Sequence, residues 1–248
     1  MKYWLLLLSF FATTQLCMAQ TNSELTSMLD VAEDYISLGD YEAAMQQVDK
    51  ILEINGSHLK ATATKIDLYL LTGDYKKADK LAEEALERFG NSAIILLEKG
   101  KASIRRGKNK DAIEELSDAL SESGSDRELQ SKIFVNRGAA YQKLQRFNEA
   151  MEDYSSAIDL NSTNPNVYMY RGVIYYSQTD YMEAISDFDQ VIEIDPQNPF
   201  AFYNRGMAYF KLQKFEEACD DFHKACELGN TSACRMIVNH CIEINRNR

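Results

Sequence analysis

The sequence predicts an all-α protein built from a repeated helical hairpin, and three observations support this fold class. Residues recur at a spacing of 34, so that Gly172 and Ala184 are followed by Gly206 and Ala218. Each period contains two helix-length segments separated by a turn signal. The chain has 45% hydrophobic residues and only 3 prolines, which leaves long stretches free to form helices.

The first nineteen residues are set apart from these repeats. They carry one basic residue, an apolar run over residues 3–13, and small residues that end at Ala19. The run is shorter than the roughly 20 residues that a membrane-spanning helix needs. We therefore expect a signal peptide, residues 1–19, and an exported protein, periplasmic or secreted and of bacterial type. A lipid anchor on Cys17 is disfavoured because the preceding Leu16 is large.

The charge of the chain limits its partners. With 38 acidic and 27 basic residues, the formal net charge is −11. Nucleic-acid binding requires a basic surface, so we expect no nucleic-acid partner. We also expect no integral membrane segment once the signal peptide has been removed.

The 34-residue period divides the chain into six hairpins: residues 25–58, 59–92, 93–126, 131–164, 165–198 and 199–232. Four residues, 127–130, are inserted before the fourth hairpin. Because four residues make about one helical turn, we expect the first helix of that hairpin to be longer. The expected organisation is a signal peptide over 1–19, repeats one to three over 20–126, repeats four to six over 127–232, and a capping helix over 233–248.

Small residues recur at two positions of the period. Position 20 holds Ala44, Ala78, Ala112, Ala150, Ala184 and Ala218. Position 8 holds Ala32, Ile66, Gly100, Gly138, Gly172 and Gly206. Antiparallel helices approach closely only where both present little side chain, so these positions predict the contact between the two helices of a hairpin. Larger residues at position 24, such as Phe188 and Phe222, are expected to fill the adjacent space.

Turn signals stand between the two helices of several hairpins. They are Gly39-Asp40, Gly73-Asp74, Gly107-Lys108 and Thr179-Asp180. Such residues favour tight turns, so they predict where each first helix ends. The helical period, the turns and the small residues thus agree on the same hairpins.

Hairpins four to six resemble tetratricopeptide repeats. The resemblance is carried by Gly138, Tyr141, Ala150, Tyr154 and Ala157, by Gly172, Tyr175, Ala184, Phe188 and Pro196, and by Gly206, Tyr209, Ala218, Phe222 and Ala225. Ile66 in hairpin two, and Ser103 with Asn109 in hairpin three, depart from the family pattern. The resemblance implies a right-handed α-solenoid with six repeats, a concave face made by the first helices, and a more polar capping helix at its end.

The resemblance also implies a groove for a protein or peptide partner. Carried onto hairpins five and six, the groove positions are Met169, Val173, Tyr176, Phe200, Tyr203, Met207 and Phe210. This apolar strip suits a docked peptide or helix; the alternative is that the capping helix or a neighbouring chain covers it. In hairpin three the same positions hold Lys101 and Arg105, a basic groove patch that could receive an acidic segment or simply be a solvated helix face.

Arginine recurs at position 7 of hairpins four to six. These residues are Arg137, Arg171 and Arg205, at a position where the family usually has an apolar residue. We interpret the arginines as structural, with the stem packed and the guanidinium paired to a neighbouring acidic residue.

Four cysteines lie close to the C-terminus. Cys219 and Cys226 are seven residues apart, as are Cys234 and Cys241, so each pair lies on one helix face. Folding the two helices back at residue 230 predicts the disulfides Cys226–Cys234 and Cys219–Cys241, which an exported protein could form. Two alternatives remain: free thiols acting as small core residues, or a zinc site that adds His223 to Cys219, Cys226 and Cys234. The segment 224–234 also resembles Sel1-like repeats, in which such cysteines bridge two helices.

The sequence shows no constellation of catalytic residues. The three histidines lie in different hairpins, and neither a phosphate-binding loop nor a nucleophile elbow is present. We therefore expect no enzyme activity, no cofactor and no metal. The predicted function is an exported, non-catalytic scaffold that binds other proteins or peptides. The alternatives are a structural module that self-associates into a homo-oligomer, and a cysteine-based metal-binding or redox-responsive repeat.

Overall fold

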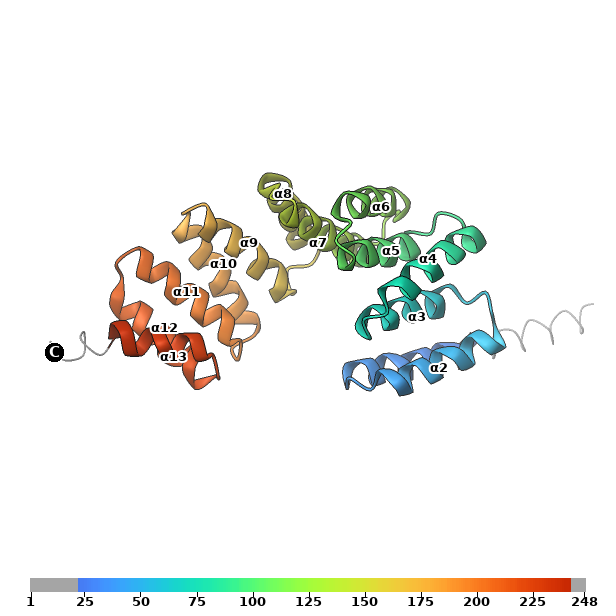
Figure 1. Cartoon of the computed structure of the whole chain (residues 1–248), viewed down its shortest axis with the longest axis horizontal. Helices are drawn as coiled ribbons and strands as arrows, with labels where there is room; N and C mark the ends of the chain where they lie inside the picture. Colours follow the sequence, from blue (N-terminus) through green and yellow to red (C-terminus); the bar gives the residue numbers. More distant parts are fainter. Residues whose placement is uncertain (1–21, 242–248) are drawn as a thin grey trace, which may run out of the picture. The chain divides into compact units, whose positions relative to one another are not determined.

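The computed structural model describes residues 22–241, which are helical apart from short connections and contain no strand. The predicted signal peptide and residues 242–248 of the predicted capping helix lie outside the described residues. The helices are residues 22–37, α2 (Tyr41–Ile54), α3 (Leu59–Leu71), α4 (Tyr75–Phe89), α5 (Ala93–Arg105), α6 (Asn109–Glu122), α7 (Arg127–Lys143), α8 (Phe147–Leu160), α9 (Pro165–Ser177), α10 (Tyr181–Ile194), α11 (Pro199–Lys211), α12 (Phe215–Glu227), α13 (Thr231–Met236) and the π-helical turn η1 (Ile237–Cys241) (Figure 1).

The chain forms two compact units. Unit 1 ends at Lys108 and contains the helix of residues 22–37 and α2 to α5, whereas unit 2 begins at Asn109 and contains α6 to η1. In unit 2 the helices pair as α7 with α8, α9 with α10, and α11 with α12, and α8 and α10 pack on the next first helices. In unit 1, α3 packs on α2 and on α4, and α4 packs on α5. This confirms the predicted all-α fold of stacked hairpins.

The inserted residues lengthen one helix, as expected. Helix α7 has 17 residues, whereas α9 and α11, the first helices of the next two hairpins, have 13 each. The extra turn is added at the N-terminal end, where Asp126 caps the helix by accepting a hydrogen bond from the Leu129 N–H.

The glycines at position 8 of hairpins four to six lie against the large residues of position 24. A methyl group added at Gly138, Gly172 or Gly206 would lie 2.8–2.9 Å from the ring of Tyr154, Phe188 or Phe222, respectively. These three rings are fully buried. Each glycine therefore makes room for a large aromatic residue on the second helix of its own hairpin.

Ile66, which departs from the repeat pattern, has a compensating partner. Ile66 and Ala82 are both fully buried in one hydrophobic cluster of unit 1. Ile66 occupies position 8, where hairpins four to six have glycine, and Ala82 occupies position 24, where those hairpins have an aromatic ring. In this hairpin the larger side chain is on the first helix and the smaller one on the second, the reverse of hairpins four to six. A packed core tolerates such an exchange of volume.

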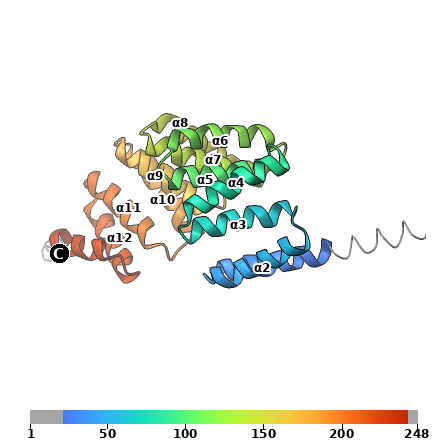
Figure 2. The ribbon, with the colours of Figure 1, turned by 45° about the vertical axis from the view of Figure 1, so that its right-hand side comes forward.

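The described part of the C-terminal end is one continuous helical segment that begins two residues before the predicted capping helix. Helix α13 begins at Thr231, and after Met236 the chain continues as the π-helical turn η1 to Cys241. Both α13 and η1 contact α12, beside which α13 is drawn in red in Figures 1 and 2. Met236 and Ile237 pack on the cluster that contains Phe222. The segment therefore covers the last hairpin of unit 2.

Over residues 22–241, none of the helices is both long enough and apolar enough to span a membrane.

Candidate functional site

The predicted groove residues lie on α9 and α11, two first helices of unit 2 that contact each other. Both helices begin in the same way: Asn164 and Asn198 accept hydrogen bonds from N–H groups of the first turn, and Pro165 and Pro199 follow them. Asparagine caps and proline at the first helical position stop a helix from starting earlier. The two helices are thus set in the same register, which aligns their side chains.

The side chains of this face are partly or largely exposed. Phe200 is 63% exposed and Val173 is 39% exposed, while Met169, Tyr203 and Met207 are half-buried. Soluble proteins usually bury phenylalanine, so a largely exposed one beside other apolar groups marks a surface that could be covered by a partner. We call the seven predicted residues the α9–α11 face.

Two residues of the α9–α11 face, Met169 and Tyr176, contact neighbouring polar or aromatic side chains. The amide nitrogen of Asn204 lies 3.4 Å from the sulfur of Met169, which links α11 to α9. The Tyr176 ring packs edge-on against Tyr181, with 5.4 Å between ring centroids. Burial, together with the neighbouring Tyr181 and Tyr203 hydroxyls, raises the pKa of Tyr176 above its usual value. The tyrosine therefore stays neutral at physiological pH.

The far end of the face is covered by the C-terminal turn. Phe210 packs edge-on against Phe215, with centroids 5.3 Å apart, and the ring of His240 lies 4.9 Å from Phe210. The alternative that the C-terminal cap covers the groove is thus correct for Phe210. Phe200 and Val173 remain exposed among the described residues.

Tyr181, Phe215 and His240, which contact residues of this face, were not predicted from the sequence. A signal for the first two was present, because an aromatic residue at position 12 is followed by another at position 17 in hairpins five and six. His240 had no such signal, since its position depends on how the C-terminal turn folds back.

Three arginines, one on each of α7, α9 and α11, are neutralised by buried carboxylates. Arg171 donates from Nε and Nη2 to the two carboxylate oxygens of Asp187 at 2.9 and 2.7 Å, and from Nη1 to the Ser155 hydroxyl at 3.0 Å. Corresponding contacts join Arg137 to Asp153 and Ser117, and Arg205 to Asp221 and Asp189. Each arginine therefore connects both helices of its own hairpin to the preceding second helix. This confirms the structural interpretation of the three arginines.

The electrostatics of these pairs match their geometry. The hydrogen bonds that Asp187 and Asp221 accept raise the pKa values of Arg171 and Arg205, although burial opposes the shift. Burial raises the pKa of Asp221, and the Arg205 contacts only partly offset that effect. Aromatic rings lie on either side of each guanidinium; for Arg205 they are Phe202 and Tyr209, 5.6 and 5.9 Å away. The three guanidinium groups are consequently paired with groups of the protein itself.

The predicted basic groove patch lies in unit 1 and is only partly basic. Lys101 forms ion pairs with Asp67 and, at 2.8 Å, with Glu98. Burial lowers the pKa of Lys101, but the Glu98 and Asp67 carboxylates raise it overall. Arg105 lies exposed in the last turn of α5. The charge of Lys101 is therefore compensated, which weakens the case for an acidic ligand at this patch.

Unit 1 also contains a pocket formed by α2, α3 and α4. Its lining is Leu52, Gly56, Thr62, Lys65, Leu81, Glu84, Ala85, Arg88 and Phe89. Lys65 is paired with Asp49 at 2.6 Å, and Arg88 donates to the Gly56 carbonyl at 2.5 Å. Two cations of the pocket are thus engaged with the protein itself.

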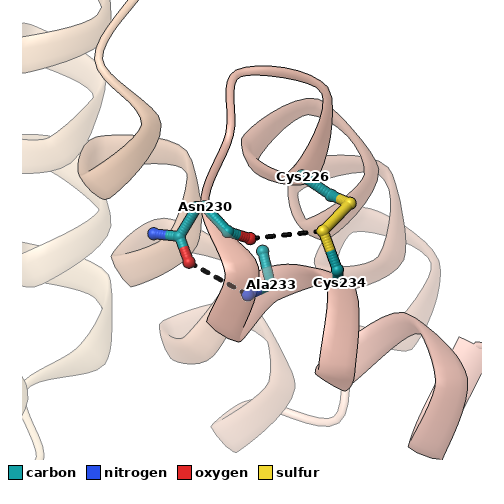
Figure 3. Close-up of a disulfide and its surroundings, with 4 residues drawn as sticks. All are labelled: Cys226, Asn230, Ala233 and Cys234. Carbon is teal, nitrogen blue, oxygen red and sulfur yellow. Dashed lines mark hydrogen bonds between the residues drawn. A yellow bond between two sulfur atoms is a disulfide. The ribbon is translucent and has the colours of Figure 1, made fainter.

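The four cysteines pair as the spacing predicted. The sulfur atoms of Cys219 and Cys241, and those of Cys226 and Cys234, lie within bonding distance, and the Cα atoms are 5.7 and 4.9 Å apart. These Cα separations suit disulfides. Asn230, between the helices, caps α13 by accepting a hydrogen bond from the Ala233 N–H, and its carbonyl oxygen lies 3.4 Å from the Cys234 sulfur (Figure 3). The cap sets where α13 begins and so places Cys234 opposite Cys226.

The alternative zinc site is not assembled in this arrangement. In the part of the chain that the structure describes, no three histidine, cysteine, aspartate or glutamate side chains are grouped so that they could hold a metal ion. Cys219 and Cys226 face Cys241 and Cys234 instead.

Comparison with known proteins identifies the repeats. The sequence profile of the family Iml2/Tetratricopeptide repeat protein 39 matches residues 14–197, and a profile described as Tetratricopeptide repeat matches residues 199–232. A curated relative from Schizosaccharomyces pombe, DnaJ homolog subfamily C member 7 homolog, is 25% identical over 144 residues. That match covers 53% of this chain and 30% of the relative, so the chain spans less than a third of that protein.

Solved structures show the same fold. The structure described as PilF of Pseudomonas aeruginosa superposes with a TM-score of 0.73 at 18% identity, covering 89% of this chain and 99% of that one. The structure of MamA has a TM-score of 0.60 at 26% identity, covering 68% of this chain and 96% of that chain. Tetratricopeptide repeats are a scaffold fold typical of protein–protein interaction.

Proposed function

Because the chain belongs to the Iml2/Tetratricopeptide repeat protein 39 family of tetratricopeptide repeat proteins, we propose that it is a non-catalytic scaffold that binds a protein or peptide partner through the α9–α11 face. Stacked helical hairpins present aligned first helices over several repeats. A partner segment could therefore contact two hairpins at once.

The observation that carries this proposal is the exposure of apolar side chains where the nearby cations are neutralised. Phe200 and Val173 are exposed, while Arg171 and Arg205 are held by Asp187 and Asp221. Burying an exposed phenylalanine contributes about 1.5–3 kcal/mol to binding, and no unpaired arginine has to be desolvated with it. The face therefore favours an apolar partner segment, docked as a helix or an extended peptide.

We further propose that the protein acts outside the cytoplasm with both cysteine pairs oxidised. The sequence of residues 1–19 supports export, and the paired cysteines support an oxidising compartment. The resemblance of residues 224–234 to Sel1-like repeats also predicts oxidised cysteines, because in those repeats such cysteines bridge two helices. The mass of the exported protein tests both points: cleavage after Ala19 and a loss of about four hydrogens are expected.

A matched pair of variants tests the binding face. We expect Val173→Glu with Phe200→Glu to abolish capture of a partner in the native host, because each change places a charge in the apolar contact. Met182→Glu is the control, since Met182 is 57% exposed but lies on α10, outside the α9–α11 face. Calorimetry with the captured partner should give an affinity at least ten-fold weaker than that of the wild type for the double variant, but not for Met182→Glu. Equal affinities of the two variants would disprove the proposed face.

Self-association is distinguished by the same variants. If a second copy of the chain occupied the α9–α11 face, the mass from light scattering would rise with concentration for the wild type and for Met182→Glu. The mass of the double variant would stay that of a monomer. A concentration-independent monomeric mass for all three proteins would leave a different protein as the partner.

A further inference from the structure

The C-terminal turn η1 lies over one end of the proposed binding face and is attached there by one cysteine pair. Helix α13 and η1 run back along α12 from the turn at Asn230. At the end of this segment, His240 packs on Phe210, and the adjacent Cys241 is joined to Cys219. We propose that the Cys219–Cys241 disulfide is a redox-controlled latch that keeps η1 over Phe210 and so limits how far the apolar surface extends along α11.

The two cysteine pairs differ in what they restrain. Cys226 and Cys234 are eight residues apart in sequence and lie next to the turn that already joins α12 to α13. Cys219 and Cys241 are 22 residues apart, and they join the beginning of α12 to the far end of η1. A cross-link restricts the chain more when the loop it closes is longer. The pair near the turn therefore adds little restraint to His240, whereas the distant pair fixes its position.

Among the described residues, the other contacts of η1 are the packing of Ile237 on the Phe222 cluster and of His240 on Phe210. Helix α13 has only six residues, and most of η1 is exposed, including Val238 at 65%. Isolated helices of this length are unstable in water, so the segment depends on its attachment to α12. When the latch opens, the turn can leave, and the half-buried Phe210 at the end of α11 becomes more accessible.

Burial sets the order in which the pairs open. Cys226 and Cys234 are half-buried, but Cys241 is 1% exposed and Cys219 is 8% exposed. Thiol–disulfide exchange requires a thiolate to reach a sulfur atom, so the pair near the turn reacts first and the latch requires stronger conditions or a local opening. Opening the latch adds two electrons and two protons to the sulfur–sulfur bond and gives two thiols, while a dithiol reductant is oxidised to its own disulfide. The Cys219–Cys241 latch therefore opens only under more strongly reducing conditions than those that open the Cys226–Cys234 pair, or after a local opening.

The latch regulates the proposed binding face and so rests on the proposed function, but a test of the latch requires no partner. Amide hydrogen exchange is measured on the mature full-length chain for two peptides, one covering 207–217 and one covering 235–241. The samples are the oxidised wild type, the wild type treated with dithiothreitol, C219A/C241A, and C226A/C234A as the matched control. Circular dichroism first confirms that each variant retains its helices.

We expect exchange in both peptides to rise at least about ten-fold in C219A/C241A and in the fully reduced wild type, because local opening becomes easier. Oxidised C226A/C234A should exchange as slowly as the oxidised wild type. Equal increases in the two double variants, or no increase in either, would overturn the latch. If C219A/C241A does not fold, the wild type reduced stepwise provides the test: exchange must rise when the Cys219–Cys241 bond is lost, followed by mass, and not when the other bond is lost.

This result is separable from the binding proposal. Rapid exchange on reduction together with unchanged partner capture in Val173→Glu/Phe200→Glu would support the latch and refute the binding face. The reverse combination would support the face and refute the latch.

Discussion

Units 1 and 2 use the same repeat position to join successive hairpins, but with different chemistry. In unit 1 the residue at position 7 is a lysine in the second and third hairpins: Lys65 pairs with Asp49 at 2.6 Å, and Lys99 pairs with Glu83 at 3.8 Å. In unit 2 it is an arginine that binds a buried aspartate with two hydrogen bonds and also reaches the preceding helix. A planar guanidinium can serve several acceptors at once, which a lysine ammonium does less well. Unit 2, which carries the proposed binding face, is thus cross-linked more strongly.

The turns show the opposite difference. Unit 1 places glycine where the backbone needs a positive φ, at Gly39, Gly73 and Gly107. At the same place in unit 2, Gln145, Thr179 and Gln213 adopt φ values of 60–72°. Residues with a Cβ are strained there by about 1–2 kcal/mol. Unit 2 therefore combines strained turns with strong arginine anchors, whereas unit 1 combines relaxed turns with weak ion pairs.

The largest expected effect distinguishes the two kinds of anchor. Asp187→Ala leaves the largely buried Arg171 guanidinium without its carboxylate partner and should lower the free energy of unfolding by about 3–5 kcal/mol. Asp49→Ala in unit 1 should cost about 1 kcal/mol or less, because 45% of the Asp49 side chain is exposed. Urea unfolding followed by circular dichroism measures both. Equal losses would show that the arginine anchors are no stronger than the lysine pairs.

The helix contact in unit 2 is the next target. Gly172→Ala places a methyl group 2.8 Å from the Phe188 ring and should destabilise the protein by about 1–3 kcal/mol. Phe188→Leu in the same chain should recover part of this loss, because the smaller side chain leaves room for the methyl group. If the loss in the double variant equals the sum of the losses in the two single variants, direct contact between residues 172 and 188 is not the cause.

Alkaline pH provides a third test, which involves the aromatic core of unit 2. Burial, together with Tyr170 and Asp153, raises the pKa of Tyr154 well above its usual value of 10.0. A raised pKa in the folded state means that Tyr154 contributes its full stability below about pH 10 and loses it as the pH rises further. Unfolding experiments at pH 8 and pH 11 should show a stability loss of up to about 1.4 kcal/mol per pH unit for this one group.

The control for the alkaline loss is Tyr154→Phe. This variant lacks the hydrogen bond from the tyrosine hydroxyl to Gln142, so it should be about 1 kcal/mol less stable at pH 8. Its additional loss between pH 8 and pH 11 should be smaller than that of the wild type. The same additional loss in both proteins would exclude Tyr154 as the titrating group.

The smallest expected effect concerns the turns. Thr179→Gly should stabilise the protein by about 1 kcal/mol, because glycine adopts the positive φ of that position without strain. Gly73→Ala in unit 1 should destabilise it by a similar amount, since φ is 84° there. Melting temperatures that move in opposite directions would support the comparison. A decrease with Thr179→Gly would mean that the threonine side chain stabilises its turn.

Much of the fold could be predicted because the repeat places equivalent residues at a fixed spacing. The six alanines at position 20 gave the register of the hairpins, and the four inserted residues gave the longer helix α7. The interpretation of Arg137, Arg171 and Arg205 as paired structural residues was also correct. The cysteine spacing predicted both pairs that the structure brings together, while their oxidation in the native protein stays a prediction.

Other features could not be predicted from one repeat at a time. The compensation between Ile66 and Ala82 depends on which side chains meet across two helices, and Ile66 alone is a departure from the family pattern. The cover on Phe210 depends on a π-helical turn near the C-terminus, which no periodicity indicates. The binding face itself was assigned from the resemblance, and its partner stays unidentified.

The sequence by itself determined the hairpin repeat, its turns and the faces on which the small residues, the arginines and the cysteines lie, because helical periodicity converts spacing along the chain into direction around a helix. The tertiary structure alone decided which acidic groups became buried, which aromatic rings stayed exposed, and that His240 covers the end of α11. These outcomes depend on the packing of side chains from different helices, and exposure is a property of the assembled surface.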